Sequence, residues 1–71
     1  MISYKPLKVT LAEKEISRKE LAKACGISTM TMARIDKGEQ IGLNILDKIC
    51  QYLQVPLNKV VEIKLEEPKD K

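Results

Sequence analysis

The sequence predicts an all-α fold, a compact bundle of five short helices, from three observations. Apolar residues recur at the helical spacings of three and four along the chain, and no segment alternates strictly for long. The glycines and prolines fall between these periodic segments, where helices begin and end. The apolar residues are mainly aliphatic, because Trp and Phe are absent and Tyr4 and Tyr52 are the two aromatic residues.

The length of 71 residues is that of one small domain. A chain of this size buries only about 60% of the surface that it exposes when unfolded, so we expect modest stability. We assign residues 1–65 to the domain. The polar segment 66–71, EEPKDK, is expected to be a disordered tail.

Composition argues against several classes of protein. The chain has no His and two Cys, which is too few for a structural zinc site, and we expect no metal or other cofactor. It has no apolar run of about 20 residues for a membrane span and no signal-peptide core after its N-terminus. We therefore expect a cytoplasmic protein with reduced thiols and no membrane association.

The cysteines are predicted to be core residues. Cys25 and Cys50 both lie on apolar stripes, and neither has an obvious basic neighbour or helix start to lower its pKa. A redox pair remains the alternative if the two meet in space. Without His, and without a Ser/Lys or paired-carboxylate arrangement, we do not expect an enzyme.

The first two helices have clear boundary signals. The first is predicted over about residues 7–14, with Pro6 at its start and Leu7 and Leu11 on one face. The second opens at Ser17, which forms a capping box with Glu20, and it ends before Gly26. The residues of the second helix that we expect to face inward are Leu21, Ala24 and Cys25.

Three further helices are predicted. Ser28 caps a third helix over about residues 29–37, which stops at Gly38. A fourth covers about residues 43–53, and a short fifth begins at Pro56 and ends near Val61. The expected inward residues are Met32 and Ile35 of the third helix and Leu46, Ile49, Cys50 and Leu53 of the fourth.

The net charge of +3 is concentrated in one part of the chain. Residues 17–37 hold five basic and two acidic side chains, so the whole positive excess lies in less than a third of the sequence. Such local positive charge is typical of a nucleic-acid contact. The alternative is that these side chains form an ordinary solvated helical face. The charge distribution by itself favours this alternative over a nucleic-acid contact.

The spacing within residues 18–37 predicts a helix-turn-helix, two short helices joined by a turn of three to four residues. The helices cross closely, which requires a small residue, and the turn requires a residue that tolerates positive φ. A buried aliphatic residue pins the turn, and apolar anchors on the third helix leave its opposite face free. Six residues meet these requirements and complete the packing: Leu21, Ala22, Gly26, Ile27, Met32 and Ile35.

With these residues the chain resembles the Cro/repressor-type (XRE-like) helix-turn-helix DNA-binding family. The match rests on residues 17–22, Gly26–Ser28, Met32, Ile35 and Lys37–Gly38, and it continues through Leu43, Leu46, Ile49, Cys50, Leu53 and Pro56. The resemblance spans about residues 7–63. It implies a five-helix domain that regulates transcription, in which the third helix enters the major groove of double-stranded DNA, commonly as a homodimer on a two-fold site.

The resemblance also implies roles for individual residues. The outward, base-reading side of the third helix consists of Thr29, Met30, Ala33 and Arg34. Among them Arg34 can donate twice to guanine, and the other three suit a thymine methyl. The candidates for phosphate binding are Arg18, Lys19, Ser28, Thr31, Lys37 and Asn44. Each role has an alternative. Arg34 is either a base reader or a solvated side chain that can pair with Glu39, and Arg18 and Lys19 are either phosphate contacts or ordinary surface residues. Met30 either reads a base or packs within the protein.

Two departures from the family pattern favour a second hypothesis. Many phage members carry a first-helix arginine that pairs with an acid at the end of the third helix. Leu11 stands there in this chain, which leaves Asp36 without that partner. Glu39 adds a negative charge in the following loop. The alternative function is therefore a protein-interaction module, such as an antitoxin-type protein that binds a protein partner.

The C-terminal side of the domain offers an apolar edge for dimerisation. This edge consists of the predicted fifth helix with Val60, Val61, Ile63 and Leu65. It either closes the core or forms a two-fold interface, and Lys64–Leu65 is a candidate for pairing as a strand. We expect a homodimer.

Overall fold

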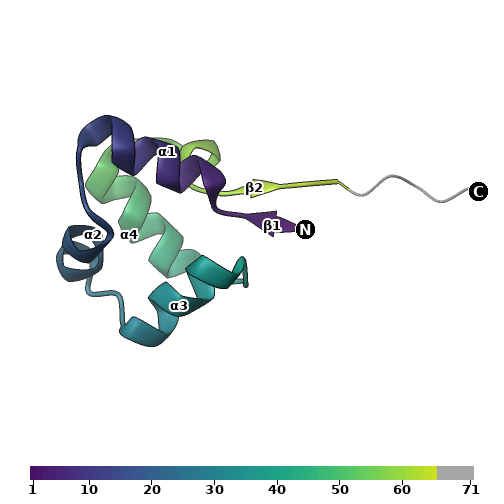
Figure 1. Cartoon of the computed structure of the whole chain (residues 1–71), viewed down its shortest axis with the longest axis horizontal. Coiled ribbons are helices and arrows are strands. Elements are labelled where there is room, and N and C mark those ends of the chain that lie inside the picture. The colour runs from purple at the N-terminus through teal and green to yellow at the C-terminus, as the bar shows by residue number, and fades with distance from the viewer. Residues whose placement is uncertain (66–71) are drawn as a thin grey trace, which may run out of the picture.

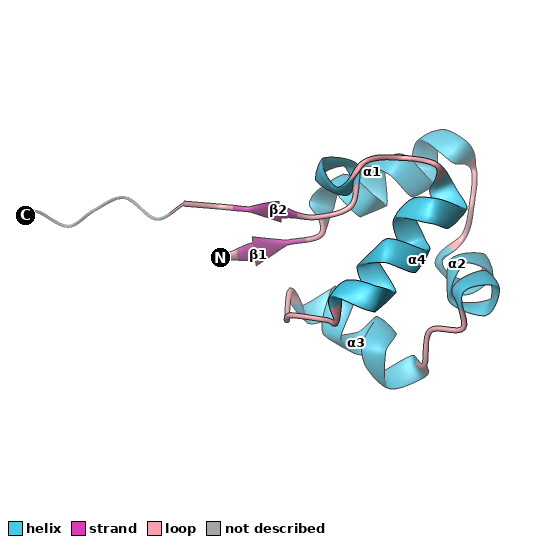
Figure 2. Ribbon diagram, turned by 180° about the vertical axis from the view of Figure 1, so that it is seen from behind, coloured by secondary structure: helices cyan, strands magenta, loops and turns pink. Residues whose placement is uncertain are grey.

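Four α-helices and a short antiparallel sheet make up the computed structural model, which describes residues 1–65 (Figures 1 and 2). The predicted disordered tail, residues 66–71, lies outside the described residues. The helices are α1 (Lys5–Lys14), α2 (Arg18–Cys25), α3 (Thr29–Lys37) and α4 (Leu43–Leu53), with a single 3₁₀ turn, η1 (Leu57–Lys59). The strands are β1 (Ile2–Ser3) and β2 (Glu62–Ile63).

The helices surround one aliphatic core, and α2 packs principally against α4. Leu21 of α2, Ile49 of α4 and Val60 after η1 are completely buried. The other buried apolar side chains are Tyr4, Leu7, Leu11, Cys25, Ile27, Ile35, Leu46 and Leu53. Every helix therefore contributes to the same core.

The prediction of five helices is wrong. Within residues 1–65 there are four α-helices, and the expected fifth is only the 3₁₀ turn η1. Its hydrogen bonds run from the Lys59 amide to the Pro56 carbonyl, 3.0 Å, and from the Val60 amide to the Leu57 carbonyl, 2.9 Å. Three residues after a proline do not provide the length that α-helical propagation requires. The other four predicted helices are present, and α1 begins two residues earlier than expected.

The two ends of the chain pair as a ribbon that the helical prediction missed. Ile2 lies opposite Ile63 and Ser3 opposite Glu62. The pairing extends to Met1 and Lys64, since the Met1 amine donates to the Lys64 carbonyl, 2.9 Å, and the Lys64 amide to the Met1 carbonyl, 2.7 Å. The strand considered at 64–65 therefore lies two residues earlier.

Three of the expected inward residues are less buried than predicted. Ala24 is exposed, and Met32 and Cys50 are only half-buried. On α2 the buried stripe passes through Leu21 and Cys25, which are four residues apart, and Ala22 packs beside them. Ala24 lies outside this stripe.

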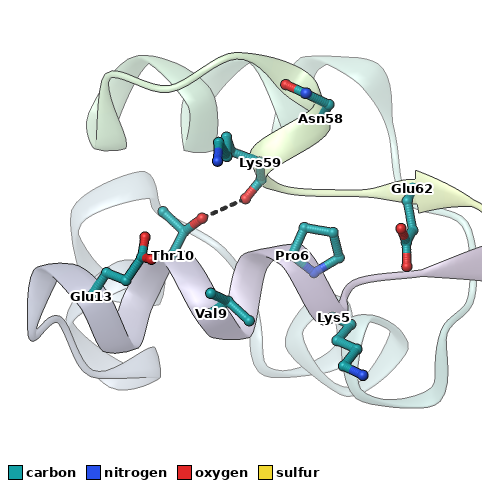
Figure 3. A pocket seen from close by; sticks show the side chains of 8 residues that line it. All are labelled: Lys5, Pro6, Val9, Thr10, Glu13, Asn58, Lys59 and Glu62. Carbon is teal, nitrogen blue, oxygen red and sulfur yellow. Dashed lines mark hydrogen bonds between the residues drawn. The ribbon is translucent and has the colours of Figure 1, made fainter.

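Two side-chain hydrogen bonds hold the loops against α1. The Tyr4 hydroxyl donates to the Glu39 carbonyl in the α3–α4 loop, 2.7 Å. The Thr10 hydroxyl donates to the Lys59 carbonyl of η1, also 2.7 Å (Figure 3). Because Thr10 is buried, its bond links α1 to η1 where water has little access.

We predict that Thr10→Val lowers the free energy of unfolding by about 1–3 kcal/mol, because the Lys59 carbonyl loses its donor. Denaturant unfolding measures this change. Thr10→Ser is the control, since it keeps the hydroxyl and should be the milder variant. A Val variant as stable as the original, or more stable than the Ser variant, contradicts the prediction.

Candidate nucleic-acid interface

The turn between α2 and α3 is built by local hydrogen bonds. The Ser17 hydroxyl accepts from the Glu20 amide and the Glu20 carboxylate accepts from the Ser17 amide, both at 3.0 Å, which confirms the capping box. At the other end of α2, Gly26 has φ 66°, and the Ile27 amide donates to the Ala22 carbonyl, 2.8 Å. This left-handed exit turns the chain and directs Ile27 into the core.

The start and end of α3 are fixed in the same way. The Ser28 hydroxyl accepts from the Thr31 amide, 3.1 Å, and donates to the Thr31 hydroxyl, 3.0 Å. At the C-terminus Gly38 has φ 73°, and the Glu39 amide donates to the Arg34 carbonyl, 2.8 Å. The orientation of α3 is then set by the buried Ile35 and the half-buried Met32.

One face of α3 is free of the core. Its residues follow the helical spacing and are all exposed, with Met30 at 68%. We call this face the recognition strip; it consists of Thr29, Met30, Ala33, Arg34 and Lys37. It contains all four predicted base-reading residues, so the structure brings them together. The exposure of Met30 disfavours the alternative that it packs into the core.

The first turn of α2 lies beside the first turn of α3. Arg18, Lys19 and Thr29 line a shallow depression of about 240 Å³ between the two helices. Lys19 is exposed there, whereas Ser28 already uses its hydroxyl in the cap and Thr31 is half-buried. Two of the predicted phosphate-binding residues therefore adjoin the recognition strip at its N-terminal end.

Asp36 has a partner that the sequence did not reveal. Arg18 forms an ion pair with Asp36, so a residue of α2 takes the place of the missing first-helix arginine. Both side chains are nearly half exposed, and such a pair stabilises the fold by at most about 1 kcal/mol. It is the one ion pair within residues 1–65, so the alternative pairing of Arg34 with Glu39 is not present.

The remaining phosphate candidates lie at the other end of α3. Lys37 is in its last turn, and Asn44 is in the first turn of α4, where it is exposed. Lys5 and Lys8 of α1 line a depression of about 440 Å³ together with Lys37. Sequence reasoning missed this gathering of lysines because it considered the charge of residues 17–37 only.

Both cysteines are free thiols that lie in or beside the core. Cys25 is buried and its thiol donates to the Lys48 carbonyl, 3.7 Å, while Cys50 is half-buried. Burial raises the pKa of both thiols, and the nearby Asp47 raises that of Cys50 further. The protonated forms are therefore favoured, which fits the core role predicted for them.

Other kinds of site find little support in the part of the chain that the structure describes. Residues 1–65 contain no cluster of three or more metal-ligating side chains, and none of their helices has the length and apolar character to cross a membrane. A depression of about 280 Å³ lies between α1 and η1, away from α3 (Figure 3). Its lining is mixed, with Val9 beside Glu13 and Lys59.

The two glycines that end α2 and α3 should differ in their tolerance of a side chain. Gly26→Ala meets no atom within 4 Å, so its cost of about 1–2 kcal/mol comes from the positive φ alone. Gly38→Ala pays the same cost and also places its Cβ 3.3 Å from the Ile2 carbonyl oxygen. We predict a larger loss of unfolding free energy for Gly38→Ala. Equal losses, or the reverse order, contradict this.

Comparison with known proteins agrees with this geometry. The family model of the Cro/C1-type HTH DNA-binding domain matches residues 6–64. The crystal structure of the transcriptional regulator VanUg, form II, is similar with a TM-score of 0.84 and 33% sequence identity, covering 86% of this chain and 81% of that chain. No curated protein matches the chain. The predicted resemblance is confirmed, and the chain belongs to the Cro/C1-type helix-turn-helix DNA-binding family.

Proposed function

We propose that this protein is a sequence-specific DNA-binding transcriptional regulator whose α3 reads the major groove. The observation that carries the proposal is the recognition strip, an exposed helical face that ends in two basic side chains. The family membership supports DNA binding, and VanUg, a similar structure, is itself a transcriptional regulator. A helix in this position of the motif is the element that enters the groove.

Within the strip, Arg34 is the residue proposed to read a base. Its guanidinium can donate two hydrogen bonds to the O6 and N7 atoms of guanine, and no acid within residues 1–65 holds it. Thr29, Met30 and Ala33 present methyl groups of the kind that contact thymine. The strip therefore combines one polar reader with an apolar surface.

The proposed phosphate contacts flank the strip on both sides. Arg18 and Lys19 lie at the N-terminus of α2, where unpaired amides and the helix dipole favour an anion. Lys37 and Asn44 lie at the opposite end of α3. Contacts of this kind fix the register of a protein on DNA without reading its sequence.

Ser28 and Thr31 have a smaller part in this scheme. The Ser28 hydroxyl donates to that of Thr31, which leaves the Thr31 proton free to reach a phosphate oxygen. We propose further that the protein acts in the cytoplasm as a homodimer on a two-fold site, the common arrangement for such domains.

The alternative function, an antitoxin-type protein that binds a protein partner, has lost one of its three arguments. It rested on the short tail, which lies outside the described residues, on the missing first-helix arginine and on Glu39. Arg18 now supplies a partner for Asp36, and within residues 1–65 the exposed acid Glu39 still favours the alternative. A stoichiometric protein partner in a pull-down, together with no DNA binding at low salt, would support it over the regulator.

Arg34→Ala should relax base preference at one position of the site. A bidentate contact to guanine provides about 1–3 kcal/mol of discrimination, so we expect that preference to fall by about 5- to 150-fold. Selection from random DNA pools, followed by binding assays across a range of salt concentrations, measures it. Selection of no sequence by the unaltered protein would overturn the proposed function.

Lys19→Ala is the matched control for Arg34→Ala. A lysine that contacts phosphate contributes equally to the binding of all DNA sequences, so the affinity should fall by the same factor for each of them. The slope of log affinity against log salt concentration should become shallower by about 1. If Arg34→Ala also weakens all sequences alike, Arg34 contacts phosphate and not a base.

Asp36→Asn should strengthen DNA binding. The substitution releases Arg18 from its ion pair and makes its guanidinium available to phosphate. We expect a rise of a few fold in affinity for all sequences and a steeper dependence on salt. Glu39→Gln is the control, because it removes a nearby negative charge without releasing Arg18. Equal effects of the two variants show that net charge alone is responsible.

A further inference from the structure

Exposed apolar side chains gather where the two chain ends meet. A groove of about 260 Å³ separates the β1–β2 ribbon from α4 and η1, and its wall is almost entirely apolar. Ile63 on this wall is 62% exposed, and Leu65 just beyond it is 89% exposed. The apolar side chains that line this groove include Ile2, Ile41, Leu43, Leu57, Val61 and Ile63.

The hydrogen bonds of the ribbon show which backbone groups are unpaired. Met1 and Lys64 exchange two hydrogen bonds, so they form a hydrogen-bonded pair of the antiparallel ladder. Because such pairs alternate with non-bonded ones, Ile2 and Ile63 form a non-bonded pair. The amide and carbonyl of Ile63 therefore point away from β1, on the side where Figures 1 and 2 show no other element.

The ribbon has one apolar and one polar face. Residues directly opposite each other in a ladder point to the same side, and neighbours along a strand point to opposite sides. Ile2 and Ile63 therefore share a face, to which the alternation adds Leu65. Glu62 and Lys64 lie on the other face. The apolar face is the one that lines the groove.

A second copy of this chain matches the free edge of β2. Two β2 strands paired antiparallel about a two-fold axis must be centred on one residue. Centring on Glu62 or on Lys64 places like charges opposite each other, which is unfavourable. Centring on Ile63 places each Glu62 opposite the partner's Lys64, and it also pairs the outward amide and carbonyl of Ile63 with those of the partner's Ile63.

We infer that two copies of this protein associate through β2, with Ile63 on the two-fold axis, to form a four-stranded sheet. In this register Leu65 lies opposite the partner's Val61, on the apolar face. Each Leu65 then covers the partner's groove beside Val61 and Leu57. The sheet pairs an exposed edge and buries apolar side chains that are open to water in the single chain.

This surface deepens the proposed homodimer, but its formation requires no DNA, so association is tested without it. Sedimentation equilibrium should show the unaltered protein forming a dimer in the micromolar range. Lys64→Glu and Glu62→Lys should each weaken association about tenfold, because two attractive pairs become repulsive. The double exchange Glu62→Lys with Lys64→Glu should restore the dissociation constant to within about threefold.

The controls make each outcome decisive. Lys48→Glu makes the same change of charge on α4 and should leave association unchanged. Circular dichroism of the dilute variants checks that the monomer fold is kept. A protein that stays monomeric up to millimolar concentration overturns the inference. The inference is also overturned if the single charge variants associate as tightly as the unaltered protein. It is overturned as well if the double exchange does not restore the dissociation constant. Binding to a single half-site, measured separately, reports on the proposed function.

Discussion

The packing of α2 against α4 is the interaction on which the rest of this structure depends. It buries Leu21 and Ile49 completely, and Val60 closes the same core from the C-terminal side. A fully buried aliphatic side chain contributes about 1.5–3 kcal/mol, which is a large share of the stability of a small domain. The α3 helix adds Ile35 to this core, and this buried side chain sets which face of the helix points outward.

Local rules were sufficient to predict the four α-helices and the outward face of α3, although they also predicted a fifth helix where only η1 forms. Serine caps, the glycine stops and helical spacing act within a few residues, so α3 and α4 have the bounds that the sequence predicted. Once Ile35 is assigned to the core, helical geometry places Met30, Ala33 and Arg34 outside. The candidate site was therefore predictable as a surface, whereas the base proposed for each side chain depends on the sequence of a DNA partner.

The features that were missed all depend on contacts between distant residues or on unusual backbone. The ribbon joins Ile2 to Ile63, and strands of two residues carry no periodic signal. The pair of Arg18 with Asp36 joins two helices whose crossing is known only once they pack. The ends of α1 and α4 were predicted, but not their backbone: Glu15 and Gln54 adopt the left-handed region with φ 57° and 56°, where the sequence has no glycine.

The two exposed faces of the molecule, the recognition strip on α3 and the apolar face of the β1–β2 ribbon, differ in chemistry. The α3 face carries the exposed basic residues Arg34 and Lys37, which suit the proposed replacement of water by phosphate. The ribbon presents Ile63 and Leu65, whose exposure to water costs free energy that only another apolar surface removes. Tyr4, directly after β1, donates a hydrogen bond to the Glu39 carbonyl in the loop after α3, so one side chain links the segment that bears the ribbon to the segment that follows the recognition strip.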